Sequence, residues 1–214
     1  MKKKYNIAVV GLGQIGSYLL NELNIKKRII EVKTGVKINV VAISAKNIKK
    51  KRKFKFNKKI FYSNPLEIFK KHKVDILFEV IGMSDGISKK IVEVALNNKT
   101  HVITPNKALI SKHGNYLAKL AEKNNVNLEF EAAVCGGVPI IRSLKEGLIA
   151  NKINRVYGIF NGTSNYILST MEKENRNFKE VLTNAQKLGY AESNPLSDLN
   201  GDDVAAKLKI LSSL

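Results

Sequence analysis

Residues 7–16 read IAVVGLGQIG, an apolar run that passes directly into three spaced glycines. The glycines match G-x-G-x-x-G after a strand and at the start of a helix, which is the context that the dinucleotide motif requires. Gly11 permits a tight turn, Gly13 lets the backbone approach a pyrophosphate, and Gly16 allows the helix to pack closely on the strand. The first N–H groups of the helix would then face the phosphates. The predicted dinucleotide site comprises Gly11, Gly13, Gln14, Ile15 and Gly16, and the competing interpretation is a turn that merely needs glycine.

Strands and helices alternate outward from this motif. Short apolar runs predict strands at residues 7–10, 38–44, 74–81, 101–103 and 126–132. Segments of helical periodicity predict helices at residues 14–23, 65–72, 87–96 and 109–124. Strands that alternate with helices at this spacing predict an α/β fold with a doubly wound parallel sheet of Rossmann type.

The pattern changes after the Gly-Gly-Val-Pro of residues 136–139. The remaining sequence predicts a helix at 140–150, a strand at 155–160 and helices at 164–173, 178–188 and 201–214. We therefore expect a NAD(P)-binding Rossmann domain over residues 1–135 and part of an α+β substrate domain over residues 136–214.

The composition limits the class of protein. No apolar run approaches the length that spans a bilayer. The single cysteine, Cys135, allows no internal disulfide, so we expect a cytoplasmic protein without membrane association.

The net charge of +19 would ordinarily suggest a nucleic-acid partner. The excess is mostly lysine spread along the chain, and it accompanies abundant Asn and Ile, as an A/T-rich coding bias also produces. The densest block, residues 49–59, contains only Phe54 and Phe56 as aromatic residues, so we interpret it as a solvated loop. A nucleic-acid patch is the alternative, and no nucleic-acid partner is expected.

The end of the second predicted strand indicates the cofactor. An acidic residue there would bind the ribose hydroxyls of NAD. The strand instead ends at Ser44 and is followed by Lys46, with further cations at Lys49, Lys50 and Arg52. A cationic edge suits the 2′-phosphate of NADP, so we expect Ser44 and Lys46 at the cofactor and NADP as the cofactor. NAD is the alternative if these lysines only reflect the general excess.

Polar motifs follow the later strands, on the edge where open α/β sheets bind ligands. Glu79, near the end of strand 74–81, would either touch the cofactor or cap a neighbouring loop. Thr104-Pro105-Asn106-Lys107 comes between a strand and a helix, so we expect Thr104 and Lys107 at the cofactor and Lys107 aimed at the substrate. A solvated lysine is the alternative.

The segment EAAVCGGVP at residues 131–139 combines an acid with a glycine pair. Its exposed carbonyls would hold a cation or pack under the nicotinamide, and a hinge between domains is the alternative. No histidine lies near Cys135 in the sequence, so this thiol is not a predicted nucleophile.

The closing segments concentrate polar groups. Asn161-Gly162-Thr163 precedes a predicted helix, whose N–H groups and Thr163 hydroxyl would bind a carboxylate. N-capping by Thr163 or Ser164 is the alternative. Asp203 and Lys207 are four residues apart and share one face of a predicted helix.

These segments, taken in order, resemble the homoserine dehydrogenase family of the monofunctional type. The resemblance rests on five stretches: Gly11–Gly16, Thr104–Leu109, Glu131–Pro139, Gly158–Leu168 and Leu188–Lys207. It implies an NAD(P)H-dependent oxidoreductase that interconverts L-aspartate 4-semialdehyde and L-homoserine, on the pathway to threonine, methionine and isoleucine.

The resemblance also implies roles for particular residues. The implied catalytic residues are Asp203, Lys207 and Lys107. The implied substrate contacts are Gly162, Thr163, Tyr190, Glu192, Asp198 and Lys207. A monovalent cation such as sodium is implied at Glu131, Val134, Gly136 and Val138.

Elementary chemistry agrees with these roles. Hydride transfer to an aldehyde develops negative charge on its oxygen, which a lysine ammonium stabilises or protonates. Lys207 and Lys107 are both candidates for this step. Asp203 would orient a lysine and a water, while Glu192 and Asp198 suit an α-ammonium group.

Relatives continue beyond this length, whereas this chain stops within an apolar-periodic helix. We therefore expect an incomplete substrate domain, with Leu208, Ile210, Leu211 and Leu214 partly uncovered. The homodimer that relatives form is doubtful for this chain. Two other functions stay open: another Rossmann amino-acid dehydrogenase, such as one acting on aspartate, and a non-catalytic basic module that binds nucleic acid through residues 49–59.

Overall fold

The computed structural model describes residues 3–50, 52 and 56–214, and it divides into two compact units, residues 1–142 and 143–214. The basic block at 49–59 includes residues 51 and 53–55, which lie outside the described residues. The first unit extends a few residues beyond the domain boundary expected at residue 135.

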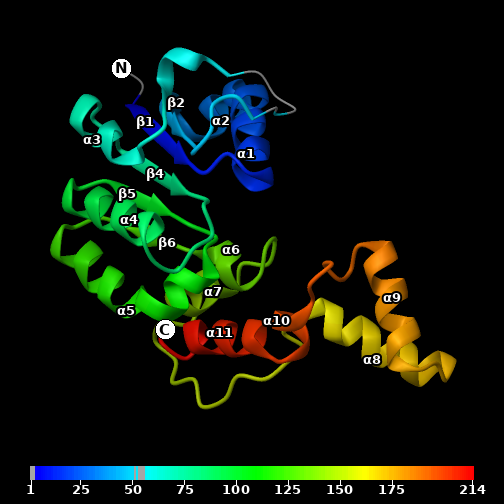
Figure 1. Cartoon of the computed structure of the whole chain (residues 1–214). Helices are drawn as coiled ribbons and strands as arrows, with labels where there is room; N and C mark the ends of the chain where they lie inside the picture. The colour runs from blue at the N-terminus through cyan, green and yellow to red at the C-terminus, as the bar shows by residue number, and fades with distance from the viewer. Residues whose placement is uncertain (1–2, 51, 53–55) are drawn as a thin grey trace. The chain divides into compact units, whose positions relative to one another are not determined.

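The first unit is built on a six-stranded sheet in which every neighbouring pair is parallel. The strands are β1 (Lys3–Val10), β2 (Val36–Ser44), β3 (Phe61–Tyr62), β4 (Ile76–Glu79), β5 (His101–Ile103) and β6 (Leu128–Glu129). Their order is β3-β2-β1-β4-β5-β6 (Figure 1), which confirms the predicted Rossmann-type doubly wound sheet. Strand order reverses between β1 and β4, and ligands of such sheets bind in the crevice at that point.

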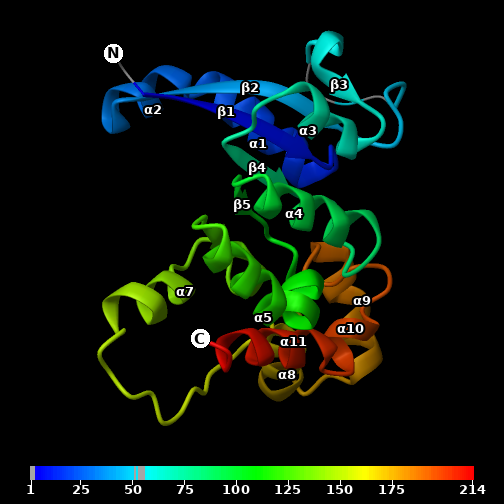
Figure 2. The same ribbon diagram turned by 90° about the vertical axis from the view of Figure 1, so that its left-hand side faces the viewer.

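Helices connect the strands. They are α1 (Gln14–Ile25), α2 (Lys27–Thr34), α3 (Ile68–Lys71), α4 (Ile87–Asn97), α5 (Lys107–Lys123), α6 (Glu131–Val134) and α7 (Ile140–Arg142), with single turns η1 (Lys58–Ile60) and η2 (Pro65–Glu67). Right-handed crossovers from β1 and from β4 run in opposite directions along the sheet. They therefore place α1 and α4 on opposite faces, as Figures 1 and 2 show.

β1 lies in the middle of the sheet, so both of its faces are covered. Ile7, Ala8, Val9 and Val10 are almost completely buried. Ile7 and Val9 pack with Leu20 of α1 and Ile43 of β2. Burial on both faces explains why this strand is continuously apolar in the sequence instead of alternating.

Two predicted strands are shorter in the structure. β4 ends at Glu79, so Val80 and Ile81 belong to the loop that follows it. β6 covers only Leu128 and Glu129, and the expected strand over residues 130–132 is wrong because the chain turns into α6 at Glu131. Glu131 therefore lies in the first turn of a short helix.

All the regular elements of the second unit are helical, and residues 148–161 connect η3 to α8 without regular structure. It contains the π-helical turn η3 (Ser143–Gly147), α8 (Gly162–Glu174), α9 (Phe178–Leu188), α10 (Leu196–Leu199) and α11 (Asp202–Leu211). Helices α8 and α9 enclose a small core of Ile167, Val181, Ala185 and Ala191. The α-helix expected over 140–150 continues only as α7 and η3.

The strand predicted at residues 155–160 is wrong. All of residues 143–214 are described and none of them forms a strand, so this segment finds no neighbour to pair its N–H and C=O groups. Val156, Tyr157 and Ile159 are exposed instead. Leu208 of α11 and Leu214 beyond its end are exposed as expected, but Ile210 and Leu211 of α11 are buried.

Among the described residues, no helix combines the length and the apolar character needed to cross a membrane.

The close packing at Gly16 yields a stability prediction. A Cβ at Gly16 would overlap the carbonyl oxygen of Gly11, whereas a Cβ at Gly13 would meet nothing within 4 Å. We expect Gly16→Ala to lower the free energy of unfolding by about 1–3 kcal/mol. Gly13→Ala, the matched control, should stay within about 1 kcal/mol of wild type. Urea unfolding followed by far-ultraviolet circular dichroism measures both, and equal midpoints for the two variants would contradict the prediction.

Candidate functional site

The glycine loop after β1 has the geometry of a phosphate-binding turn. Gly11 has a φ of 107°, and its N–H donates to the carbonyl oxygen of Ser44 at 2.9 Å. A side chain at Gly11 would clash with the Val80 carbonyl, so the loop after β4 lies directly against this turn. The space beside Gly13 is open, and α1 begins at Gln14, so free N–H groups of the first helical turn border that space. Ile15 is exposed in the same turn.

The edge beyond β2 carries one well-ordered cation. Arg52 donates from Nη2 to the Asn47 carbonyl at 2.9 Å and from Nη1 to the Lys50 carbonyl at 3.0 Å. Its Nε reaches the carbonyl of Leu12, in the glycine loop, at 3.4 Å. Lys46 is exposed on the same connection. The guanidinium of Arg52 is thus a cation held against the glycine loop, although from the sequence it was identified only as one member of a basic run.

Glu79 is completely buried at the end of β4. Its Oε1 accepts from the Ile81 N–H at 2.9 Å, and its Oε2 accepts from the Thr104 hydroxyl at 2.6 Å and from Asn106 Nδ2 at 3.2 Å. Of the two roles left open for Glu79, the structure shows the one in which it caps neighbouring loops. The Thr104 hydroxyl is committed to this carboxylate.

Lys107 is the first residue of α5, directly after the N-cap Asn106. The Asn106 side chain accepts from the Leu109 N–H at 3.1 Å, so the helix begins two residues earlier than predicted. Lys107 is half-buried on the edge that also carries the glycine loop. An asparagine before a helical pattern is a recognised start signal that could have located this cap.

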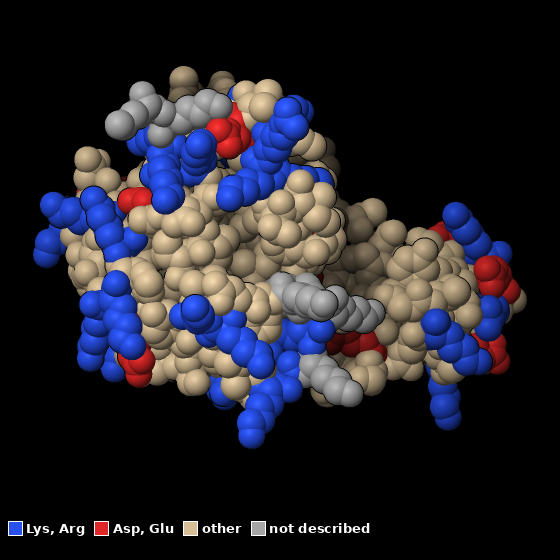
Figure 3. Space-filling view, turned by 90° about the horizontal axis from the view of Figure 1, so that it is seen from above, with Lys and Arg blue, Asp and Glu red and all other residues tan. Residues whose placement is uncertain are grey.

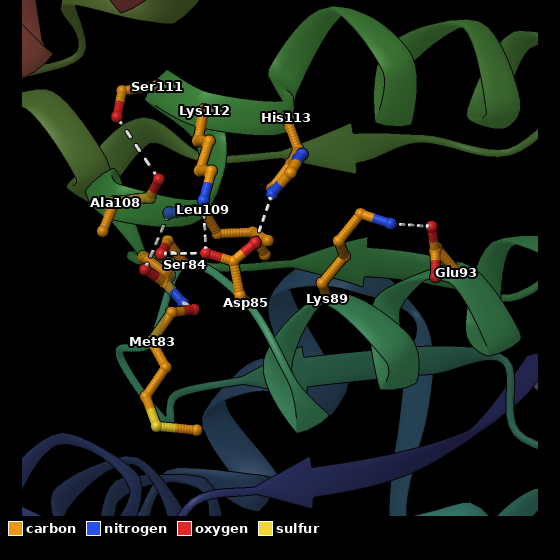
Figure 4. A network of polar contacts seen from close by, with 11 residues as sticks. Met83, Ser84, Asp85, Lys89, Glu93, Ala108, Leu109, Ser111, Lys112 and His113 are labelled. Carbon is orange, nitrogen blue, oxygen red and sulfur yellow. Dashed lines mark hydrogen bonds and ion pairs between the residues drawn. The ribbon is translucent and has the colours of Figure 1, made fainter.

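Asp85, in the loop after β4, also contacts two side chains of α5. Asp85 accepts from Lys112 Nζ at 2.6 Å and from the Ser84 hydroxyl at 2.7 Å, and it lies 2.9 Å from His113 Nε2 (Figure 4). The Lys112 ammonium, followed by the Ser84 and His113 side chains, holds the pKa of the Asp85 carboxyl well below its usual value.

The residues predicted to hold a cation lie near the end of the first unit. Glu131 accepts from the Ile141 N–H at 2.8 Å and from the Arg142 N–H at 2.9 Å, one bond on each carboxylate oxygen. The carbonyl of Val138 accepts from the Ile140 N–H at 2.9 Å. Gly136 is exposed and Val134 is buried. Among the described residues, no group of three or more His, Cys, Asp or Glu could hold a metal ion, so carbonyl oxygens would have to supply most ligands here.

The second unit gathers three of the six predicted substrate residues into one polar cluster. Asn161 Nδ2 donates to Asp198 Oδ1 at 2.9 Å and to Asp203 Oδ2 at 3.0 Å. Thr163 Oγ1 lies 2.9 Å from Asp198 Oδ2 and 2.7 Å from the carbonyl of Tyr190. We call Asn161, Thr163, Asp198, Asp203 and Lys207 the polar cluster.

Lys207 completes the polar cluster. Its Nζ lies 2.9 Å from Asp203 Oδ2, as the four-residue spacing predicts, and donates to the Phe160 carbonyl at 2.8 Å. The Lys207 side chain is 19% exposed and that of Asp203 is 9% exposed, so the pair is largely shielded from solvent. Two of the three ammonium hydrogens are used by these contacts, and the third remains to bind an oxygen of a ligand.

The other predicted substrate residues surround the polar cluster less closely. Gly162 begins α8 and is exposed. The ring of Tyr190 stacks on Tyr166 with centroids 4.7 Å apart. Glu192 is exposed, and among the described residues no hydrogen bond or ion pair joins its carboxylate to the polar cluster. N-capping by Thr163 or Ser164 is wrong, because the Asn161 side chain caps α8 by accepting from the Ser164 N–H at 2.8 Å.

Two family models match the chain. The model described as "Homoserine dehydrogenase, NAD binding domain" matches residues 11–131, and the model described as "Homoserine dehydrogenase" matches residues 139–214. Homoserine dehydrogenases from Neisseria gonorrhoeae and Helicobacter pylori are 41% and 42% identical over 212 and 218 residues. These alignments cover 99% and 100% of this chain but 48% and 49% of those proteins, so the chain spans about half the length of the curated relatives it matches.

Solved structures of homoserine dehydrogenases are also similar to this chain. The homoserine dehydrogenase of Thiobacillus denitrificans superimposes with a TM-score of 0.86 at 38% identity, covering 99% of this chain and 48% of that chain. A hyperthermophilic archaeal homoserine dehydrogenase in complex with NADPH gives a TM-score of 0.79 at 28% identity, covering 97% of this chain and 68% of that chain.

The polar cluster yields a prediction at Asn161. Asn161→Asp keeps the oxygen that caps α8 but replaces the NH₂ group between Asp198 and Asp203 with a third carboxylate oxygen. We expect the free energy of unfolding to fall by about 2–3 kcal/mol at pH 7. The loss should shrink at pH 5, where a protonated carboxyl can donate again.

The matched control is Asn177→Asp, which changes an exposed asparagine that caps α9 through the Glu180 N–H at 3.0 Å and donates to the exposed Glu180 carboxylate at 2.7 Å. That variant should lie within about 0.5 kcal/mol of wild type. Urea unfolding of both variants at the two pH values is the measurement, and equal destabilisation of the two would refute the prediction.

The Asp85 contacts predict a pH dependence of stability. A carboxyl whose pKa is lowered by folding stabilises the protein above its unfolded-state pKa of about 3.9, and this contribution is lost as the pH falls below that value. Asp85→Asn should therefore be less stable than wild type at pH 6, and the difference should narrow as the pH falls from about 4. Because Asp85 is exposed, the difference should be small and should weaken with added salt.

Urea midpoints at pH 6, 5, 4 and 3 test this expectation. The control is Glu67→Gln, which removes an exposed carboxyl that makes no hydrogen bond or ion pair within the described part of the chain. If the difference in urea midpoint between Asp85→Asn and wild type stays constant from pH 6 to pH 3, the ionised Asp85 carboxyl does not stabilise the fold as expected.

Proposed function

Because this chain belongs to the homoserine dehydrogenase family, we propose that it takes part in the NAD(P)H-dependent interconversion of L-aspartate 4-semialdehyde and L-homoserine. This reaction feeds the synthesis of threonine, methionine and isoleucine. The observation that carries the proposal is the largely buried Asp203–Lys207 pair inside the polar cluster, in a chain whose other unit is a Rossmann-type sheet.

The polar cluster suits the substrate end of this reaction. The Lys207 ammonium is fixed by Asp203 and by the Phe160 carbonyl, so it presents a hydrogen in one defined direction. Such a donor stabilises the charge that develops on the aldehyde oxygen, and it holds a proton that can pass to that oxygen. Lys107, at the start of α5 in the first unit, stays the second candidate for this role.

The remaining substrate residues would recognise the amino-acid end of the substrate. The carboxylate of Asp198, and that of Glu192, suit the α-ammonium group of the amino acid. The start of α8 at Gly162 suits its carboxylate, because helix N-terminal N–H groups bind anions. Thr163, whose hydroxyl donates within the polar cluster, would border that group. Tyr190 has an exposed ring, and its backbone carbonyl accepts from the Thr163 hydroxyl.

The first unit suits a nicotinamide cofactor. The open space beside Gly13 and the first turn of α1 accept a pyrophosphate without steric conflict. When bound, the nicotinamide supplies or accepts the hydride. Of the two cofactors we propose NADP, because Ser44 is followed by Lys46 and by the fixed guanidinium of Arg52 rather than by an acid. Thr104, directly after β5, and Lys107, at the start of α5, would border the cofactor.

We also propose a monovalent cation such as sodium at Glu131, Val134, Gly136 and Val138. Each carboxylate oxygen of Glu131 accepts one backbone N–H and keeps a further lone pair. Carboxylate and carbonyl oxygens are the donors that hard cations prefer. The chemistry of this donor set therefore fits the ion.

The partners proposed are small molecules, and the proposed location is the cytoplasm. Lys and Arg side chains are spread over the face seen in Figure 3 and do not merge into a single continuous patch there. That distribution supports the interpretation of the charge as a general lysine excess instead of a nucleic-acid surface.

The direct test is homoserine-dependent reduction of NADP and of NAD by the purified chain, followed at the absorbance band of the reduced nicotinamide. We expect turnover that is faster with NADP. Lys207→Ala should lower kcat about 100-fold or more while NADPH affinity is unchanged. Lys209→Ala, an exposed lysine on the same helix, is the control and should keep full activity. Normal turnover by Lys207→Ala would remove this lysine from the site, and turnover on aspartate but not homoserine would overturn the proposed substrate.

A further inference from the structure

Glu79 is a charged side chain with no exposed surface, located where strand order reverses. Burying a carboxylate is costly unless its oxygens are fully bonded. The three groups around Glu79 are all donors: a backbone N–H, a hydroxyl and an amide NH₂. Only an acceptor with two oxygens satisfies all of them.

The three donors belong to different parts of the ligand edge. Ile81 lies in the loop after β4, Thr104 at the end of β5, and Asn106 at the start of α5. Thr104 Oγ1 also accepts from the Asn106 N–H at 3.0 Å, and Asn106 Nδ2 donates to the Met83 carbonyl at 2.8 Å. One carboxylate therefore fixes the distance between the β4 loop and the residue that begins α5.

The same loop touches the glycine motif on its other side. The Val80 N–H donates to the Val10 carbonyl at 2.8 Å, and the Val80 carbonyl lies where a side chain of Gly11 would be. The loop after β4 therefore contacts the glycine loop on one side and the Thr104–Lys107 segment on the other. If the Glu79 carboxylate lost its hydrogen bonds, the distance between these two segments would change.

We propose that Glu79 is a positioning residue for the dinucleotide site. It does not touch the cofactor, but its carboxylate sets the spacing between the glycine loop and the segment that carries Thr104 and Lys107. The inference rests on the proposed function only in naming the ligand that this spacing serves.

Glu79→Gln is the diagnostic substitution, because it keeps the shape and changes one acceptor into a donor. In one orientation of the Gln amide the new NH₂ group faces the Ile81 N–H, and in the other it faces Thr104 and Asn106. The Thr104 hydroxyl can turn and accept from this group, because its oxygen has a second lone pair besides the one used by the Asn106 N–H. Asn106 cannot turn its amide to compensate, since its Oδ1 caps α5 and its Nδ2 also bonds Met83. The segments joined by Glu79 should therefore separate.

The matched control is Thr100→Val. Thr100 is completely buried, and its hydroxyl donates to the Val74 carbonyl at 2.7 Å, at the opposite end of the sheet. Thr104→Val is the second test variant, since it removes the shortest bond of Glu79 without changing the charge. The two threonine variants delete equivalent buried hydroxyls at opposite edges.

Amide hydrogen exchange without cofactor is the first measurement. Glu79→Gln and Thr104→Val should speed exchange about tenfold or more in segments 80–86 and 104–110, and Thr100→Val should leave those segments unchanged. A loss of global stability alone would speed exchange throughout the unit, for the control as well. Unchanged exchange at the ligand edge in both Thr104→Val and Glu79→Gln would overturn the inference, whether or not the chain binds a dinucleotide. Should Glu79→Gln fail to fold, Thr104→Val decides by the same criterion.

Fluorescence titration with NADPH is the second measurement. We expect Glu79→Gln to raise the Kd for NADPH at least tenfold and Thr100→Val to change it less than twofold. An unchanged Kd in Glu79→Gln would overturn the proposed link to the cofactor. Absence of NADPH binding by the wild-type chain would count against the proposed function instead, because the exchange result does not depend on a cofactor.

Discussion

The first unit depends on a contact between backbones that only glycine permits. The loop after β4 lies against the glycine turn so closely that a Cβ at Gly11 would clash with the Val80 carbonyl, and a Cβ at Gly16 would clash with the Gly11 carbonyl. This contact joins the two strands between which the order of the sheet reverses. It brings the ends of β1 and β4 together, so the N-terminus of α1, the buried Glu79 and the start of α5 share one edge.

The second unit is organised by a different interaction, a single amide between two carboxylates. Asn161 donates to Asp198 and Asp203 and caps α8 with its own oxygen. It therefore ties the start of α8 to both α10 and α11. Lys207 then balances the charge of Asp203. Asp198 and Asp203 can lie close together because Asn161 and Lys207 donate hydrogen bonds to them. In the first unit, three donors likewise stabilise the buried carboxylate of Glu79.

How far the sequence predicted this structure depends on how local each signal is. The glycine turn, the Rossmann-type sheet and the Asp203–Lys207 contact follow from spacing within one element or from the alternation of neighbouring elements, and they were predicted. The strand predicted at 155–160 does not form. Its Val156, Tyr157 and Ile159 are residue types common in strands, yet a strand also needs a neighbour that no local pattern specifies. From the sequence, Thr163 or Ser164 was the alternative cap of α8, because Thr, Ser and Asn all cap helices, whereas in the structure Asn161 caps it. The contacts of these side chains with α10 and α11 are not visible in the local sequence.

The difference between local sequence patterns and contacts between distant elements also explains why the lysines were hard to rank from the sequence. With 37 Lys and Arg residues, a lysine in a motif is weak evidence of function. What separates Lys207 from an exposed residue such as Lys209 is the restriction of its ammonium by two acceptors at 2.9 Å and 2.8 Å. Holding a long side chain in one position costs conformational entropy, and a solvated lysine gains nothing from it. A donor that is already fixed loses little further entropy when charge develops on a bound oxygen, and this is the physical reason for proposing Lys207 as the donor to the aldehyde oxygen.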